Sequence, residues 1–100
     1  MMKDEFEDIV GFQWDDGNTD KNRINHQVEN WECEQVFFNT PLIVLGDLKH
    51  SAKEERSAAF GCTDDGRRLV VIFTKRGNLL RIISARDMNR KEIKFYEENG

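Results

Sequence analysis

Four arginines lie close together in the second half of the chain, where a strand pattern passes into a helix pattern. Each guanidinium group holds its N–H donors in a planar fork that matches a carboxylate or a phosphate. Such a cluster predicts a binding site for an anion. The four residues are Arg76, Arg81, Arg86 and Arg90.

The segment HSAKEER offers groups that can exchange protons. His50, Glu54 and Glu55 are candidates for a general acid or base. Two structural interpretations stay open beside this one. The run from Glu54 to Arg56 can be an exposed charged loop that pairs with nearby arginines, and His50 can orient a turn with Ser51.

Charge is distributed unevenly along the chain. The net charge of −4 argues against a nucleic-acid binder, because contacts to phosphate dominate that affinity. Residues 1–40, however, carry three basic and ten acidic residues, whereas residues 67–94 carry nine basic and two acidic. We therefore expect one face to attract an anion and the acidic part to attract a basic partner. Alternatively, the two parts neutralise each other in space.

The length and composition limit the class of protein. A chain of 100 residues, 38% hydrophobic, is predicted to form a single domain with a small core. It contains no apolar run long enough to cross a membrane and no signal-peptide pattern, so we expect a cytoplasmic protein. Cys33 and Cys62 lack a paired spacing, which favours reduced core thiols and no metal site. No cofactor is predicted.

The hydrophobic pattern predicts an α+β fold with N-terminal helices, an antiparallel meander and a C-terminal helix. The final helix is expected to open with a Ser84–Asp87 capping box, which would put Arg86 beside the unpaired N–H groups of its first turn. Trp14 and Trp31 are interpreted as core residues. The expected elements are a frayed acidic lead (1–8), strands (11–14, 42–45, 56–62, 69–74 and 79–85) and helices (18–25, 29–38 and the final one, ending at Glu98).

Three residues near these elements have two interpretations each. Strand alternation places Arg81 with Leu79, Ile83 and Ala85, so it is either at the edge of the buried core or paired with an acid, and a catalytic role stays open beside both. Tyr96 either stacks on a substrate or packs in the core. His26 is either structural or a binding residue.

The spaced polar residues of the chain are similar to the pattern of the BrnT family of bacterial toxins. The second half is the more specific part of this resemblance, because it combines HSAKEER with RIISAR. The matching positions are Phe12 to Asp15, Asn22, His26, Val28, Asp47, His50, Ser51, Glu54, Glu55, Arg56, Gly61, Arg76, Gly77, Arg81 to Arg86, Glu92 and Tyr96.

The resemblance implies a ribonuclease toxin of a type II toxin–antitoxin pair with a fold similar to RelE and ParE. It also implies a BrnA-like ribbon-helix-helix antitoxin as partner in a hetero-oligomer, with operator DNA bound only through the antitoxin. Metal-independent RNA cleavage needs proton carriers and cations at phosphorus. The expected catalytic residues are His50, Glu54, Glu55, Arg76, Arg81 and Arg86, and the expected RNA-binding residues are His26, Arg56 and Tyr96.

The chain departs from the family pattern at three positions. The family usually has lysine where Asn18 and Asn25 stand and glycine where Gln27 stands. The missing cations leave open a second hypothesis, a catalytically weak homologue that binds the antitoxin and acts as a co-repressor. Glutamine does not easily adopt a positive φ, so the turn after His26 can differ in shape.

Overall fold

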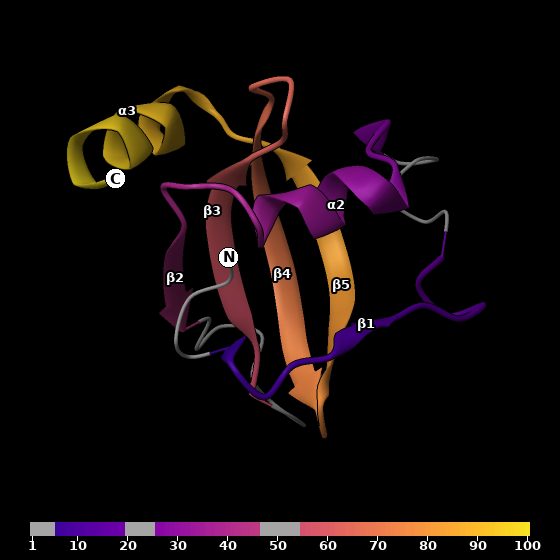
Figure 1. Cartoon of the computed structure of the whole chain (residues 1–100). Helices are drawn as coiled ribbons and strands as arrows, with labels where there is room; N and C mark the ends of the chain where they lie inside the picture. The colour runs from indigo at the N-terminus through magenta and orange to yellow at the C-terminus, as the bar shows by residue number, and fades with distance from the viewer. Residues whose placement is uncertain (1–5, 20–25, 47–54) are drawn as a thin grey trace.

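Five strands form one mixed sheet in the described part of the chain, which is residues 6–19, 26–46 and 55–100 of the computed structural model. The sheet order is β1-β5-β4-β3-β2, with β1 parallel to β5 and the other neighbours antiparallel (Figure 1). The strands are β1 (Gly11–Gln13), β2 (Ile43–Gly46), β3 (Ser57–Cys62), β4 (Arg68–Arg76) and β5 (Leu79–Asp87).

The central strand β4 is apolar on both faces and therefore divides the core in two. Leu69, Val71 and Phe73 belong to the larger cluster, whereas Val70 and Ile72 belong to a smaller one on the other face. This arrangement follows from the alternation of side chains along a strand. Both faces of the sheet must therefore be covered by other elements.

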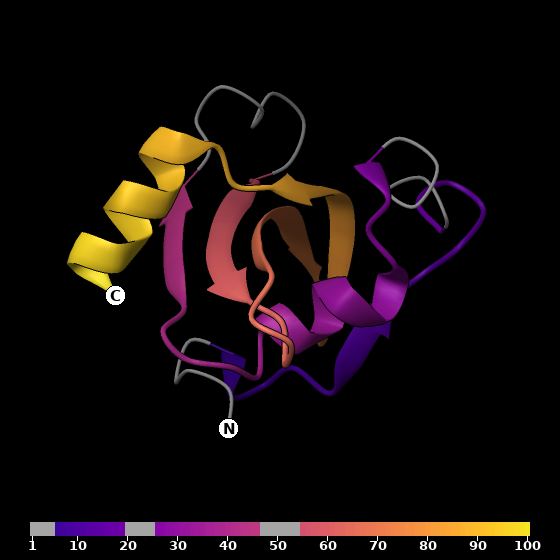
Figure 2. The ribbon, with the colours of Figure 1, turned by 90° about the horizontal axis from the view of Figure 1, so that it is seen from above.

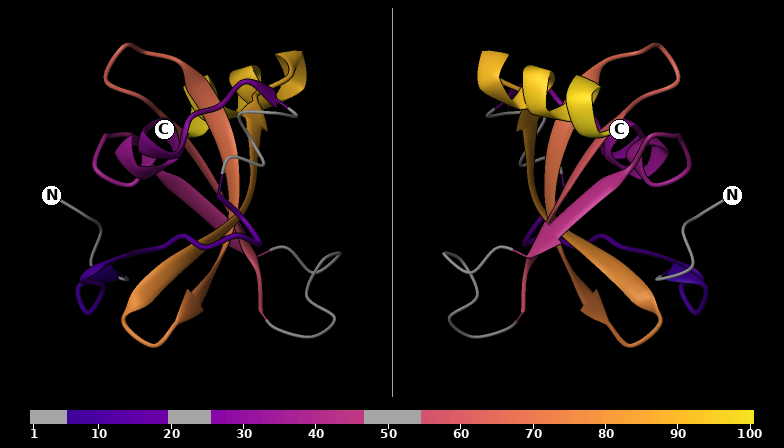
Figure 3. Two further views of the ribbon diagram at one scale, coloured as in Figure 1. Left: turned by 90° about the vertical axis from the view of Figure 1, so that its right-hand side faces the viewer. Right: turned by 90° about the vertical axis from the view of Figure 1, so that its left-hand side faces the viewer.

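One helix packs against each face. Helix α2 (Asn30–Val36) contributes Cys33 and Val36 to the larger cluster, and α3 (Arg90–Asn99) contributes Tyr96 to the smaller one. Figures 2 and 3 show the two helices on different sides of the twisted sheet. Below, the two faces of the sheet are called the α2 side and the α3 side.

Helix α2 approaches the sheet closely at a glycine of the sequence pattern. A Cβ atom on Gly61 would lie 2.7 Å from Val36 Cγ1, so only glycine fits there without displacement. Burial raises the pKa of the neighbouring Cys33 thiol to about 12. Cys33 and Cys62 are both free thiols, as expected, although Cys62 is only half-buried.

The predicted start of the last helix is wrong. Strand β5 continues to Asp87, and α3 begins after Asn89, whose side chain accepts from the Glu92 N–H while Glu92 accepts from the Asn89 N–H. The strand persists because β4 supplies ladder partners as far as Leu69↔Asp87. Asparagine is also among the best N-cap residues.

Two apolar residues lie where the sequence analysis did not expect them. Phe6, assigned to a frayed lead, is buried and packs edge-on against Phe37 and Phe73 at centroid distances of 5.6 and 5.7 Å. Trp31, assigned to the core, is 53% exposed. Trp14 is half-buried against the larger cluster. Of these assignments, only that of Trp14 agrees with its packing.

The N-terminal helices are only partly matched by the structure. The second corresponds to α2, with Glu29 as its N-cap residue. Most of the first, expected over residues 18–25, lies outside the described residues, and the described residues up to Thr19 form a turn. Within the described ranges, no helix is long and apolar enough to cross a membrane.

Gln27 adopts the positive φ for which glycine is usual, at 58°. Its carbonyl accepts a 2.9 Å hydrogen bond from Arg67 Nη1, which holds the turn in place. A left-handed conformation costs a non-glycine residue about 1–2 kcal/mol. We therefore expect Gln27→Gly to raise the free energy of unfolding by about 1 kcal/mol, measured by urea denaturation. Gln27→Ala keeps the Cβ atom and should give no such gain; equal stability of the two variants would exclude strain at this position.

Candidate functional site

A bulge in β5 brings two of the predicted catalytic arginines to the same face of the sheet. Arg81 and Arg86 are five positions apart, so regular alternation would send them to opposite faces. The register changes from Phe73↔Ile82 to Ile72↔Ser84, which inserts one extra residue into β5. Such a bulge redirects the side chains that follow it. It also moves Ala85 to the α2 side, contrary to the predicted alternation.

The arginines face the α3 side. Arg86 pairs with Val70, which belongs to the α3-side cluster, and Arg81 pairs with Thr74, four residues further along β4. Arg76 continues the same alternation at the end of β4. Arg76, Arg81 and Arg86 together are called the arginine face below.

Arg81 is held by the turn that follows β1. Its Nη1 and Nη2 atoms donate to the two carboxylate oxygens of Asp15 at 2.7 and 3.1 Å, and Nη1 also donates to Gln13 Oε1 at 3.1 Å. The Arg81 hydrogen bonds lower the pKa of Asp15, and the charge of Arg76 adds to this effect. The interpretation of Arg81 as paired with an acid is therefore confirmed, and it is compatible with a catalytic role.

Asn18 is buried and positions this turn. Its Oδ1 accepts from the Asp15 N–H at 2.8 Å, and its Nδ2 donates to the carbonyls of Gln13 and Ile82, both at 2.9 Å. The amide thus joins the turn to β1 and β5. Asn18 thereby fixes Asp15 against Arg81.

Arg86 is paired with an acid of α3. Its Nη1 and Nη2 atoms donate to the two oxygens of Glu92 at 2.7 and 2.9 Å, which lowers the pKa of Glu92. Because Arg86 lies in β5 and not in the first turn of the helix, the predicted contribution of helix N–H groups to its anion site is lost. The Arg86 side chain is still 45% exposed.

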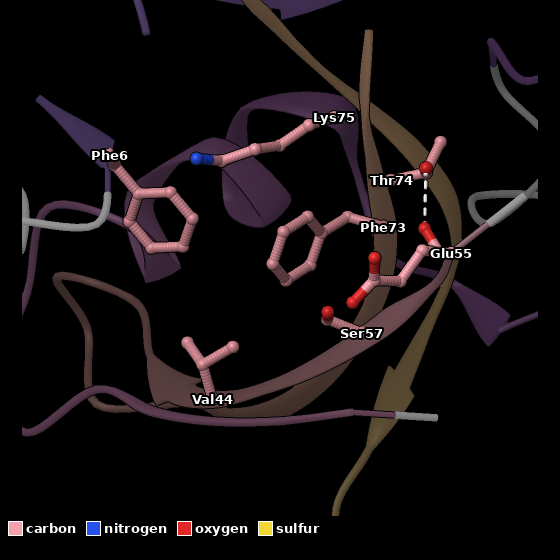
Figure 4. Close-up of a pocket in the computed structure, with 7 residues that line it drawn as sticks. All are labelled: Phe6, Val44, Glu55, Ser57, Phe73, Thr74 and Lys75. Atoms are coloured by element: carbon pink, nitrogen blue, oxygen red, sulfur yellow. Dashed lines mark hydrogen bonds between the residues drawn. The ribbon is translucent and has the colours of Figure 1, made fainter. Parts of the chain in front are cut away.

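Glu55 points away from the arginine face. It lines a cavity of about 370 Å³ on the α2 side, and the Thr74 hydroxyl donates to its carbonyl at 2.7 Å (Figure 4). The structure therefore separates this carboxylate from the arginines with which the sequence analysis grouped it. The cavity is lined by Phe6, Val44, Glu55, Ser57, Phe73, Thr74 and Lys75.

The remaining predicted site residues have different positions. His50 and Glu54 fall in residues 47–54, outside the described residues. Arg56 directly precedes β3 and, by the alternation of that strand, shares the α3 side with Ala58. Tyr96 is 5% exposed and its hydroxyl donates to the Pro41 carbonyl at 2.6 Å, so it packs in the core and is not available to stack on a base.

An arginine that was not singled out from the sequence, Arg67, contacts four other residues. Arg67 donates to Asp87 at 2.7 and 3.0 Å, to both oxygens of Glu32 at 3.1 Å, and to the carbonyls of Gln27 and His26. It thereby joins α2, the end of β5 and the turn at His26. No local sequence signal marks this role, because its partners are 20 to 41 residues away.

These ion pairs predict a loss of stability in acid. Arginines lower the pKa of Asp15, Asp87 and Glu92 below the ordinary values of 3.8 for Asp and 4.5 for Glu. Their contribution is thus present above about pH 4.5 and lost as the pH falls through the folded-state pKa values. We expect the free energy of unfolding to decrease below pH 4.5 and to decrease less in Asp87→Asn. Equal slopes for variant and wild type would exclude this origin.

Comparison with known families adds one finding. The model of a family described as "Ribonuclease toxin, BrnT, of type II toxin-antitoxin system" matches residues 14–92. The match includes the arginine face together with Asp15, Asn18, Arg67 and Glu92. No curated protein matches the chain.

Proposed function

Because the chain belongs to the BrnT family of ribonuclease toxins of type II toxin–antitoxin systems, we propose that it is an endoribonuclease that cleaves RNA on its arginine face. The observation that carries this proposal is the bulge in β5, which sends Arg81 and Arg86 to the same face as Arg76. Three guanidinium groups on one face suit the phosphates of a single RNA strand.

The proposed cleavage needs no metal ion. The ribose 2′-hydroxyl attacks the neighbouring phosphorus, the 5′-oxygen of the next nucleotide leaves, and a 2′,3′-cyclic phosphate remains. Arginines stabilise the charge that develops on the phosphoryl oxygens, while a base and an acid transfer the two protons. Since Glu55 points to the α2 side, we assign the proton transfers to His50 and Glu54.

RNA binding must displace two carboxylates from the arginines. Asp15 and Glu92 occupy the forks of Arg81 and Arg86, as a phosphate would. One partner of each pair is well exposed, Asp15 at 53% and Arg86 at 45%, so we propose that a phosphate can replace the carboxylate as the anion in each fork. Arg56 lies on the same side, and we propose that it and His26 contact flanking phosphates.

Membership of the family supports a proposal for the partner and the cellular role. We propose a BrnA-like ribbon-helix-helix antitoxin that forms a hetero-oligomer with the chain, neutralises it and alone contacts operator DNA. Without the antitoxin, RNA cleavage would stop translation in the cytoplasm. The fold assignment that accompanies this proposal is RelE/ParE-like, with a curved sheet presenting the catalytic face.

Cleavage by the purified, antitoxin-free protein tests the proposal directly. In EDTA, the wild type should cut a long single-stranded RNA and leave 2′,3′-cyclic phosphate ends, and its expression should arrest growth. Arg86→Ala should lower the cleavage rate by about a hundredfold. Lys94→Ala, a change to an 81%-exposed side chain of α3, is the matched control. Intact RNA and normal growth with the wild type would refute the enzymatic function.

A second function is favoured by the same ion pairs. Arg81 and Arg86 are each neutralised by a carboxylate of the chain itself, as in a surface that does not bind RNA. In this alternative the chain is an inactive homologue that binds the antitoxin and increases its affinity for operator DNA. Gel-shift titration of the operator with antitoxin, with and without the chain, distinguishes the two when RNA cleavage is absent.

A further inference from the structure

The outward surface of α2 carries two large aromatic side chains. Trp31 is 53% exposed and Phe38, in the turn that follows the helix, is 51% exposed. Trp31 lies in the first turn of the helix, and Phe38 lies two residues beyond its last residue, Val36. The solvent-facing side of a helix in a small protein is normally polar.

The aromatic surface continues onto β1. The centroid of the Phe38 ring lies 6.3 Å from that of Phe12 in β1. The Trp14 Nε1–H group donates to Glu34 Oε2 at 2.7 Å, and Glu34 stands between Trp31 and Phe38 in the sequence. Trp14, Trp31 and Phe38 are called the aromatic stripe. It lies on the α2 side, so the proposed RNA cleavage on the arginine face does not use it.

The border of the aromatic stripe is acidic. Residues 26–46 contain three glutamates and no lysine or arginine, and of the three only Glu32 is paired with an arginine, Arg67, in the described part of the chain. The turn after β3 adds two exposed aspartates, Asp64 and Asp65. The Asp64 carboxylate accepts a hydrogen bond from Asn39 at 2.9 Å, and the Asp64 N–H donates to the Gln35 side chain of α2 at 2.9 Å. An exposed apolar surface with this border is complementary to a segment that is apolar and basic. The negative charge of this border repels the phosphates of RNA, so it disfavours RNA binding there even though aromatic side chains can stack on bases.

We propose that the aromatic stripe is the surface on which the antitoxin docks, through a segment whose apolar side chains are flanked by lysine or arginine. This inference rests on the proposed function, since it takes the partner from the toxin–antitoxin pair. It goes beyond that function by placing the partner on the α2 side, across the sheet from the arginine face. Trp31 is the central contact, because tryptophan is among the residues enriched in dominant interface contacts.

Binding of the protein encoded by the reading frame next to this chain's gene tests the proposal. Isothermal titration with that protein should give about a ten- to hundredfold weaker affinity for Trp31→Ala, and a larger loss for Trp31→Ala/Phe38→Ala. Asp65→Lys should weaken binding severalfold and reduce its salt dependence. The matched control is Leu45→Ala, which removes a 46%-exposed apolar side chain from β2, at the far edge of the sheet from β1.

Circular dichroism and RNA cleavage by each variant accompany the titrations. The Trp31→Ala variant should keep its fold and its cleavage rate, because its side chain is half in solvent and away from the arginine face. If Trp31→Ala binds the partner as tightly as the wild type, or Leu45→Ala loses as much affinity, the docking surface is wrong while the proposed function stands. Reduced RNA affinity in Trp31→Ala would identify the stripe as a base-stacking surface and overturn the proposal. If the wild type itself does not bind the partner, the antitoxin assignment fails with it.

Discussion

Arg81→Lys is expected to slow RNA cleavage almost as much as Arg81→Ala, by about a hundredfold, although it retains the positive charge. Arg81 places two guanidinium nitrogens against one carboxylate of Asp15, and a phosphate in the same place would accept the same pair of bonds. A lysine ammonium is a point charge without this fork. Removal of one pre-positioned donor at a developing oxyanion costs about 10²–10³ in rate. Single-turnover cleavage of a labelled RNA measures the effect.

Asp15→Asn is the matched change on the other partner of the same pair. It removes the competing charge but leaves Arg81 in place, so RNA affinity should increase, and the cleavage rate at saturating RNA should change little. If Arg81→Ala cleaves at the wild-type rate, Arg81 is a structural residue and the arginine face is not the catalytic site. If only Arg81→Lys retains activity, charge and not the fork is what the reaction requires.

Arg67→Ala is expected to lower the free energy of unfolding by about 3 kcal/mol, which corresponds to a Tm decrease of roughly 15 °C for a chain of this size. The substitution leaves Glu32, whose side chain is only 12% exposed, without its cationic partner. It also releases Asp87 and the carbonyl of Gln27, whose positive φ then lacks support. Calorimetry or thermal circular dichroism measures the change.

The next residue along the chain provides the control. Arg68 forms one ion pair with Glu97, and both side chains are well exposed, at 41% and 56%. Arg68→Ala should therefore cost no more than about 1 kcal/mol. A Tm change in Arg67→Ala no larger than in Arg68→Ala would mean that the Arg67 contacts contribute little to stability. Arg67→Lys should give an intermediate value, because it keeps the charge with fewer donors.

Much of the fold could be predicted from local patterns. The four strands from Ile43 to Asp87 lie within a few residues of their predicted positions, and the turns between them contain Gly66 and Gly77. These elements have strong local signals, alternating apolar residues and glycines with positive φ. The start of α3 was misplaced because Ser84 and Asp87 resemble a capping box, whereas β4 offers them ladder partners that local reasoning cannot see.

The candidate site was predicted less completely than the fold. The arginines were found from residue type alone, but Asp15 and Glu92 were not predicted as their partners. The 66 positions between Arg81 and Asp15 explain the omission. Trp31 was assigned to the core from helical spacing, which gives the side of a helix that a residue occupies but not what covers that side.

The sequence by itself determined the family, the elements of the sheet and the residue types available for anion binding, because these depend on composition and on local spacing. Only the tertiary structure decided which of those residues act together. A single extra residue in β5 reverses the side on which Arg86 lies. This bulge is visible only in the pairing of β5 with β4 and not in the sequence of β5. The strand order decided that Asp15 lies beside Arg81 and that Glu55 faces the other side of the sheet. Side-chain partnership depends on distance in space, which the linear order of residues does not contain.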